Sequence, residues 1–366
     1  MGTLRRRIRR LAVRSPLGAV AGWAGRRWAG GASAFLYHRV TFRRRAGFEG
    51  NAVIEVAPDR FERQIAFLAT SHRCLSLPDA TDLLRDGRLP ERAAIVTFDD
   101  GYRDNLLAAL PILERHGVPA TVYVTTGLVD GSVRPWWYEL EEILSRRSEL
   151  TVRCDGSLLR WDLGSARAKT RAFADLSRSA RGGDQAAFAR LLEAVHDVAG
   201  EGNGGAPRSS TATPRTSNAT ADQADIGQEK LFLSWDEIAT LDAHPLITIG
   251  AHTMTHPALA RLEADAARAE LAGAKAVLER RLGHPIEHLA YPFGTPAEAG
   301  PREFALAAAV GYRTAFTTTI GHLRVDGAVN LHALPRIPVD GADTDRDLAF
   351  KASGAWALLS GAMRGR

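Results

Sequence analysis

Seven short segments of apolar and β-branched residues recur along the chain, each bounded by turn residues or by the start of a helical pattern. Runs of this length and composition are typical of buried strands. The hydrophobic pattern therefore predicts strands over residues 34–40, 93–98, 120–125, 246–250, 288–291, 312–317 and 334–339.

Helical patterns separate several of these segments. Apolar residues recur every three or four positions over residues 58–70, 104–116 and 260–282, and the last two stretches end at a glycine, which is a common helix stop. Strands that alternate with helices are typical of parallel α/β architectures. We therefore predict an α/β domain over residues 33–345, built as an irregular, incomplete (β/α) barrel of seven parallel strands.

Two stretches interrupt this alternation. Residues 136–199 are predicted to form a helical insertion. Residues 200–228 are rich in Gly, Ser, Thr, Ala and Pro and hold almost no apolar residue, so we predict a disordered loop there. A C-terminal tail is predicted over residues 346–366.

The composition is that of a globular protein with a sizeable core, since 45% of the residues are hydrophobic and 24% are charged. No apolar run is long enough to span a bilayer. The net charge of +5 owes much to eight arginines in an N-terminal tail, residues 1–32, in which no acidic residue occurs. Apolar residues interleave these arginines, so the tail is either a basic amphipathic helix at an anionic membrane surface or a solvated segment.

The sequence favours a cytoplasmic location, with peripheral contact at the inner face of the membrane as an option. The N-terminal tail lacks the uninterrupted apolar stretch and the cleavage site of a secretory signal. The two cysteines, Cys74 and Cys154, give neither a disulfide framework nor a metal-ligand spacing. Nucleic acid is not an expected partner, because the basic residues lack the interleaved aromatic residues of a single-strand-binding surface.

Two adjacent carboxylates, Asp99 and Asp100, follow the second predicted strand in the sequence Thr-Phe-Asp-Asp-Gly. Neighbouring buried carboxylates are costly unless another charge compensates them. A divalent cation bound by one carboxylate, with the other left as a base, would meet this requirement. A solvated Asp-Asp-Gly turn is the alternative.

Two histidines, His252 and His256, follow the fourth predicted strand. Their spacing of four places both rings on one side of a helical turn, and Pro257 suits the first turn of a following helix. Paired surface histidines are common. However, one carboxylate and two histidines, each placed after a strand, form the ligand set of a catalytic metal site with positions left for water and substrate.

Together, residues 97–101 and 252–256 resemble the first two motifs of the polysaccharide deacetylase family, also called the NodB-homology or carbohydrate esterase family 4 domain. The resemblance runs from about residue 35 to 339. It implies a hydrolase of the bacterial envelope that removes acetyl groups from N-acetylated sugars of a polysaccharide or lipid-linked glycan. It also implies a divalent metal, zinc in the first place, with cobalt, nickel or iron as alternatives.

The resemblance makes Asp100, His252 and His256 the metal ligands. Asp99 would be the general base that activates a water molecule. Each of these residues follows a predicted strand, and barrel enzymes gather their sites at the C-terminal ends of their strands.

The third motif departs from the family pattern. Residues 290–294 (AYPFG) match it, and they offer the backbone N–H near Phe293 for an oxyanion and Tyr291 for contact with the oxyanion or substrate. However, Ala290 stands where many members have the arginine that orients the base. We predict that Arg336, from the last strand, reaches the same place; a surface salt bridge is the alternative.

The family's general acid is the histidine of a Leu-x-His motif, and no such motif follows the last predicted strand. Residues 36–38 (LYH) lie instead in the first strand, as in a permuted member whose first and last strands are neighbours. We therefore predict that His38 is the acid. His332 is the rival if the chain is not permuted.

Trp136 and Trp137 follow the third predicted strand. They are candidates to stack on sugar rings, or to pack in the core of the insertion. Two other functions remain open: hydrolysis of a small non-sugar amide on the same barrel, and a non-catalytic role in carbohydrate binding or assembly. The complete set of two aspartates and two histidines argues against the non-catalytic role.

Overall fold

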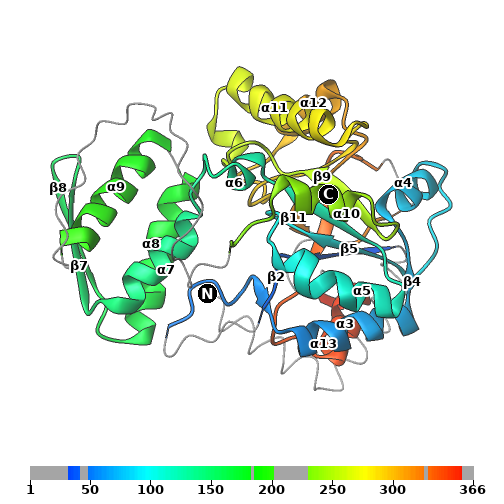
Figure 1. Cartoon of the computed structure of the whole chain (residues 1–366), viewed down its shortest axis with the longest axis horizontal. Coiled ribbons are helices and arrows are strands. Elements are labelled where there is room, and N and C mark those ends of the chain that lie inside the picture. Colours follow the sequence, from blue (N-terminus) through cyan, green and yellow to red (C-terminus); the bar gives the residue numbers. More distant parts are fainter. Residues whose placement is uncertain (1–31, 42–47, 183–184, 202–229, 325–328, 357–366) are drawn as a thin grey trace, which may run out of the picture. The chain divides into compact units, whose positions relative to one another are not determined.

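The computed structural model describes residues 32–41, 48–182, 185–201, 230–324 and 329–356, which fall into two compact units (Figure 1). Of the described residues, the first unit holds 32–41, 51–134, 232–324 and 329–356, and the second holds 48–50, 135–182, 185–201 and 230–231. Almost all of the predicted basic tail and of the predicted disordered loop lies outside the described residues. Those two predictions therefore stay predictions.

A ring of seven parallel strands forms the centre of the first unit. Each strand overlaps one of the seven predicted segments, so this part of the fold prediction is confirmed. The ring is closed rather than incomplete, because the first strand pairs with residues 94–98 on one side and with the last strand on the other. In barrel order the strands are β1 (Ser33–Tyr37), β12 (Leu334–Pro338), β11 (Thr314–Ile320), β10 (His288–Ala290), β9 (Ile247–Ala251), β6 (Ala120–Val124) and β5 (Ala93–Phe98).

Helices and short strands surround the barrel (Figure 1). The first long helix shows why they form: it has a proline in its first turn and buries Phe61, Ile65 and Leu68, which recur along one face. These elements are β2 (Arg39–Val40), β3 (Glu55–Val56), α3 (Pro58–Ser71), β4 (Arg73–Cys74), α4 (Leu77–Arg85), the π-helix η1 (Asn105–Ala109), α5 (Leu110–His116), α6 (Thr126–Val129), α10 (Trp235–Asp242), the 3₁₀ helix η2 (Leu259–Arg261), α11 (Ala264–Leu282), α12 (Pro301–Val310) and α13 (Asp345–Ala352).

The helix predicted over residues 104–116 begins with a π-helical segment. Pro111 has no backbone N–H, so the carbonyl of Leu107 receives no regular α-helical hydrogen bond from it. A wider π-turn at this point accommodates the missing bond. The helix ends as predicted at Gly117, which adopts a left-handed conformation with φ 61°.

Side chains of the barrel strands alternate between two hydrophobic clusters. The larger cluster includes Val96 and lies between the strands and the surrounding helices. The smaller one includes Ile95, Tyr123 and Phe316 from three different strands, which point into the barrel, and it continues to Leu77 and Leu84 of α4. Residues at the C-terminal end of this interior therefore project toward one point.

The second unit is the insertion, and it is not purely helical as predicted. It holds α7 (Trp136–Arg146), β7 (Glu149–Cys154), β8 (Ser157–Asp162), α8 (Ala166–Gly182) and α9 (Gln185–Glu201) around its own apolar core. The two strands form an antiparallel hairpin whose turn residues, Asp155 and Gly156, have φ of 47° and 76°. An Asp-Gly pair between two short apolar runs is a strong hairpin signal, which the helical prediction overlooked.

The predicted C-terminal tail also needs correction, because its first residues form the helix α13. Thr344 caps the helix, and Leu348 is fully buried. Lys351 is also buried, and its Nζ lies 2.5 Å from the carboxylate of Asp343. Apolar burial and this ion pair hold residues 345–352 on the barrel.

Among the described residues, no helix is long and apolar enough to cross a membrane. The predicted contact of the basic tail with a membrane surface, and the predicted location of the protein, stay predictions.

Candidate active site

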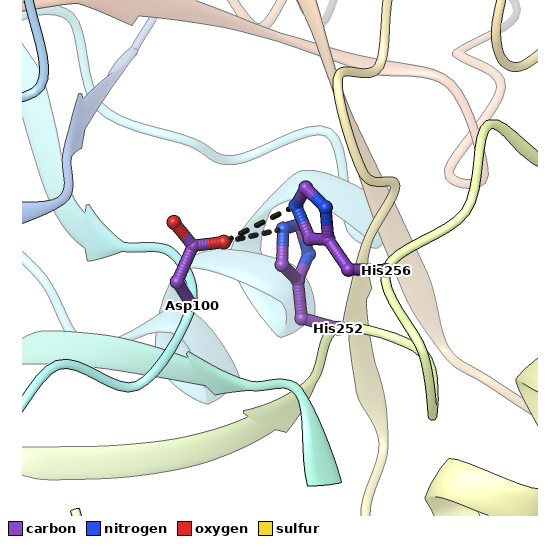
Figure 2. A group of neighbouring side chains, drawn as sticks. All are labelled: Asp100, His252 and His256. Atoms are coloured by element: carbon purple, nitrogen blue, oxygen red, sulfur yellow. Dashed lines mark ion pairs between the residues drawn. The ribbon is translucent and has the colours of Figure 1, made fainter. Parts of the chain in front are cut away.

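Three side chains from two segments converge at the C-terminal end of the barrel (Figure 2). Oδ1 of Asp100 lies 3.4 Å from Nε2 of His252 and 3.2 Å from Nε2 of His256. Within the described part of the chain, no other set of three His, Cys, Asp or Glu side chains brings its ligand atoms within 4.8 Å of one another. Two ligand atoms bound at about 2.1 Å to one tetrahedral ion would lie about 3.4 Å apart. The observed separations therefore fit a metal ligand set.

Backbone and side-chain hydrogen bonds orient His252. Its Nδ1 lies 2.7 Å from the carbonyl oxygen of Ala290, so the Nδ1–H tautomer donates there. This tautomer leaves Nε2, on the side of Asp100, as the atom able to bind a metal. The hydroxyl of Thr125, at the end of the neighbouring strand β6, donates to the carbonyl of His252 at 2.9 Å.

The segment between the two histidines is not the helical turn that their spacing predicts. Thr253 and His256 both have positive φ, 66° and 59°, which is rare for residues other than glycine and strained for a β-branched threonine. The backbone N–H of His256 donates to the hydroxyl of Thr253 at 3.1 Å. Pro257 begins no helix, since the next helical turn starts at Leu259.

Arg336 reaches Asp99 from the last strand, as the sequence led us to expect. Its Nη1 and Nη2 donate to the two carboxylate oxygens of Asp99 at 2.6 and 2.7 Å, and its Nε donates to the carbonyl of Thr317 at 3.0 Å. The guanidinium is fully buried and lies 5.9 Å from the ring centres of Tyr123 and Phe316. The contact is thus an internal, two-pronged ion pair, and the alternative of a surface salt bridge is wrong.

Both aspartates are ionised at neutral pH in this arrangement. Burial raises the pKa of the Asp99 carboxyl, but the charges of Arg336 and His252 and the hydrogen bonds from Arg336 outweigh burial and lower it. Burial likewise raises the pKa of Asp100, and its contacts with His252 and His256 bring it well below the usual value. Adjacent buried carboxylates of this kind create a negative potential that favours a bound cation.

His38 follows β1 at the same end of the barrel, and its side chain is half-buried. Burial lowers the pKa of its imidazole, and the charges of Asp100 and Asp99 partly offset this effect. The rival, His332, precedes β12 at the opposite end of the barrel, where its Nε2 bonds to the carbonyl of Tyr312 at 2.8 Å. The structure therefore brings His38, and not His332, to the two aspartates.

The third motif contributes one residue to the site and not the other. Phe293 has φ 59°, and its ring packs edge-on against the ring of His256, with the centroids 4.9 Å apart. The side chain of Tyr291 is fully buried, its hydroxyl donates to the carbonyl of His332 at 2.9 Å, and its N–H donates to Phe316. The predicted contact of Tyr291 with substrate is wrong, because both of its donors are engaged inside the protein.

The two adjacent tryptophans lie in the second unit. Trp137 is buried, and Trp136 packs edge-on against Trp137 and Phe188, with ring centroids 5.5 and 5.3 Å apart. These contacts are those of core packing. Stacking of either tryptophan on a sugar stays a prediction.

Two polar residues that the sequence did not single out hold the segment that carries His38. The side-chain amide of Asn105 donates to the carbonyl of His38 at 2.8 Å. The carboxylate of Asp104 accepts from Nε of Arg39 at 2.6 Å and from the N–H of Val40 at 3.0 Å. Both residues directly follow the Asp-Asp-Gly-Tyr-Arg run. Polar side chains in the first turn after that motif are therefore the sequence feature that could have identified them.

Comparison with known proteins agrees with the resemblance to polysaccharide deacetylases. The polysaccharide deacetylase family profile matches residues 86–153 and 212–315. A putative polysaccharide deacetylase of Bacillus subtilis is 30% identical over 91 residues, which are 24% of this chain and 30% of the relative. A poly-β-1,6-N-acetyl-D-glucosamine N-deacetylase of Staphylococcus aureus is 31% identical over 110 residues, 27% of this chain and 37% of the relative. The chain thus matches about a third of the length of these curated relatives.

Solved structures share the fold. The deacetylase PplD of Streptococcus pyogenes, solved in complex with acetate, aligns with a TM-score of 0.53 at 17% identity, over 87% of this chain and 97% of that one. At this identity the likeness concerns the fold alone. The family profile and the matched relatives agree with the motifs and assign residues 86–153 and 212–315 to the polysaccharide deacetylase family.

Proposed function

We propose that this protein is a metal-dependent hydrolase that removes acetyl groups from N-acetylated sugar residues of a polysaccharide or lipid-linked glycan and releases acetate. One observation carries the proposal: two adjacent buried carboxylates have different partners. Asp100 lies beside two imidazoles, whereas Asp99 lies against a buried guanidinium. This division separates a metal ligand from a base. The name of the Staphylococcus aureus relative supports a polymer of N-acetylglucosamine as the substrate class.

Asp100, His252 and His256 would hold the metal. Two imidazoles and one carboxylate suit zinc, and they also suit cobalt, nickel or iron. When bound, the ion would polarise the acetamide carbonyl and lower the pKa of a water molecule.

The protein's own groups would move the protons. The ionised carboxylate of Asp99, held by Arg336, would accept a proton from the water as its oxygen attacks the carbonyl carbon. His38 would donate a proton to the sugar nitrogen as the carbon–nitrogen bond breaks, leaving acetate and a free amine. General acid–base catalysis by one positioned group typically contributes about 100- to 10,000-fold in rate.

The backbone N–H of Phe293 is our candidate for the donor that faces the oxyanion. Two observations support this choice: Phe293 has left-handed backbone with φ 59°, and its ring packs against the ring of His256. In other enzymes, the loss of one such donor costs roughly 3 kcal/mol of transition-state stabilisation.

The test is acetate release from N-acetylglucosamine oligomers by the wild type and by the variant Asp99→Asn. We expect the variant to lose at least about 100-fold in kcat, and the wild type to lose its activity after chelation and regain it with added zinc. Asp343→Asn is the matched control, because it also weakens a buried aspartate–cation pair but outside the proposed site.

Three outcomes of this experiment would contradict the proposal. Chelated and metal-loaded protein could be equally active, or Asp99→Asn could lose no more activity than Asp343→Asn. Release of amine from a small ureide, with no acetate from any acetylated sugar, would place the substrate outside the carbohydrates.

A further inference from the structure

One carboxylate of α11, that of Glu270, accepts three hydrogen bonds from the loop that carries the two histidines. The loop has no helical hydrogen bonds of its own, and the N–H groups of Met254 and Thr255 both donate to Oε2 of Glu270, at 2.8 and 2.9 Å. The hydroxyl of Thr255 donates to Oε1 of the same carboxylate at 2.6 Å. Successive N–H groups that follow a left-handed residue form a concave anion site, and here the protein fills that site with its own side chain.

The side chain at the middle of the loop is seated on the same face of α11. Gly273 lies one helical turn after Glu270, and a Cβ on it would lie 1.9 Å from the sulfur of Met254. On the other side, the N–H of Gly127 donates to the carbonyl of Met254 at 2.8 Å. The loop is therefore clamped between α6 and α11. Of the three residues that make these contacts, Gly127, Glu270 and Gly273, only Glu270 is charged.

We propose that Glu270 is a positioning residue for the metal centre, an inference that rests on the proposed function. By fixing the N–H groups of Met254 and Thr255, its carboxylate stabilises the left-handed backbone at Thr253 and His256 and sets the direction of the His256 ring toward Asp100. Left-handed backbone at a residue other than glycine persists only when its surroundings stabilise it. Without the carboxylate, the loop relaxes and Nε2 of His256 leaves its place 3.2 Å from Asp100.

Zinc affinity of the metal-free protein, measured by competition with a chromophoric chelator, tests this role directly. We expect Glu270→Ala to weaken zinc binding by about 10- to 100-fold, as the loss of groups that orient metal ligands does elsewhere. Glu270→Gln keeps an oxygen that accepts the two N–H bonds, so its affinity returns to within about tenfold of the wild type. The absorption spectrum of the cobalt-substituted protein should change in Glu270→Ala, because the ligand geometry changes.

Glu279 provides a matched control on the same helix. Its carboxylate also accepts a backbone N–H, that of Ile286 at 3.0 Å, but at the far end of α11. We expect Glu279→Ala to leave zinc affinity and the cobalt spectrum unchanged, which separates positioning of the metal loop from general support of the helix.

The outcomes distinguish this inference from the proposed function. A wild-type protein that binds no zinc would overturn both. A wild type that binds zinc, together with a folded Glu270→Ala of equal affinity and identical cobalt spectrum, would overturn the role of Glu270 alone. If Glu270→Ala does not fold, Glu270→Asp takes its place: the charge remains but the shorter side chain cannot reach both N–H groups, and unchanged affinity and spectrum would again refute the role.

Discussion

Each end of the barrel buries a histidine, and the two imidazoles differ in the charges that surround them. His252 follows β9 at the C-terminal end and is 1% exposed, and His288 begins β10 at the opposite end and is 2% exposed. Both rings have Nδ1 in a hydrogen bond, to the carbonyl of Ala290 at 2.7 Å and to the hydroxyl of Thr314 at 2.8 Å. Burial and local hydrogen bonding are thus closely matched.

Their pKa values nevertheless move in opposite directions. Burial lowers the pKa of His252, but the charges and contacts of Asp99 and Asp100 outweigh burial and raise it. Burial lowers the pKa of His288 to about 4, since the nearby charge of Glu287 offsets it only in part. Burial is the same for both imidazoles, so the difference in their pKa values comes from the neighbouring carboxylates. At the C-terminal end the carboxylates outweigh burial and favour positive charge. At the opposite end burial prevails, and His288 stays neutral.

The largest expected effect on activity comes from removing a carboxylate at the C-terminal end of the barrel, compared with removing one at the opposite end. We expect Asp100→Asn to lower kcat for acetate release by about 1,000-fold or more, because a bound metal supplies several kcal/mol of transition-state stabilisation. The zinc content per chain should fall with it. Both quantities are measured on purified protein, the first by acetate assay and the second by elemental analysis.

Glu287→Gln is the counterpart at the other end, and we expect it to change neither kcat nor zinc content. Full activity with one zinc per chain in Asp100→Asn would show that the site does not depend on this carboxylate. Loss of zinc in Glu287→Gln would show that the two ends are not independent.

A smaller effect is expected from Arg336→Lys, which keeps the buried charge but removes the planar fork that binds both oxygens of Asp99. Lysine is a point charge and cannot reproduce a two-pronged contact. We expect kcat to fall by about 10- to 100-fold, the loss of roughly 1.4 to 3 kcal/mol of positioning, with zinc content unchanged. Steady-state kinetics and metal analysis of the same preparation measure the two effects.

A second buried ion pair serves as the comparison for Arg336→Lys. Lys351→Met breaks the pair with Asp343 on α13, so it should lower the melting temperature while kcat of the folded protein stays at the wild-type level. If Arg336→Lys keeps wild-type kcat, the guanidinium fork has no part in orienting the base.

The sequence predicts the barrel well because its strands are buried on both faces. Such strands read as continuous apolar runs, and all seven runs, such as residues 93–98, are barrel strands. The placement of Asp100 and His252 together also follows from the sequence, since each comes directly after a strand and the C-terminal ends of parallel strands meet.

What the sequence does not predict depends on tertiary contacts. A threonine at position 253 gives no sign of left-handed backbone, which β-branched residues normally avoid, so the sequence predicts a helical turn between His252 and His256. The partner that stabilises this loop, Glu270, lies 15 residues beyond Thr255 on a different element. Tyr291 matches a motif position, but only packing decides that its hydroxyl bonds inside the core.

The smallest effect concerns stability and not activity. His288 has a pKa of about 4 in the folded protein and about 6.5 when unfolded, so between these values the unfolded chain binds more protons. The free energy of unfolding must then decrease as the pH falls below about 6.5, by about 2 kcal/mol between pH 7.5 and pH 5. We expect His288→Asn, whose amide can donate to Thr314, to lose this part of the pH dependence in urea unfolding, with kcat unchanged.

His284→Asn should act in the opposite sense, because contact with Asp242 raises the pKa of His284 and its stabilisation is present at low pH. If wild type and His288→Asn lose stability equally on acidification, the imidazole is not held neutral, and the proposed contrast between the two ends of the barrel does not hold.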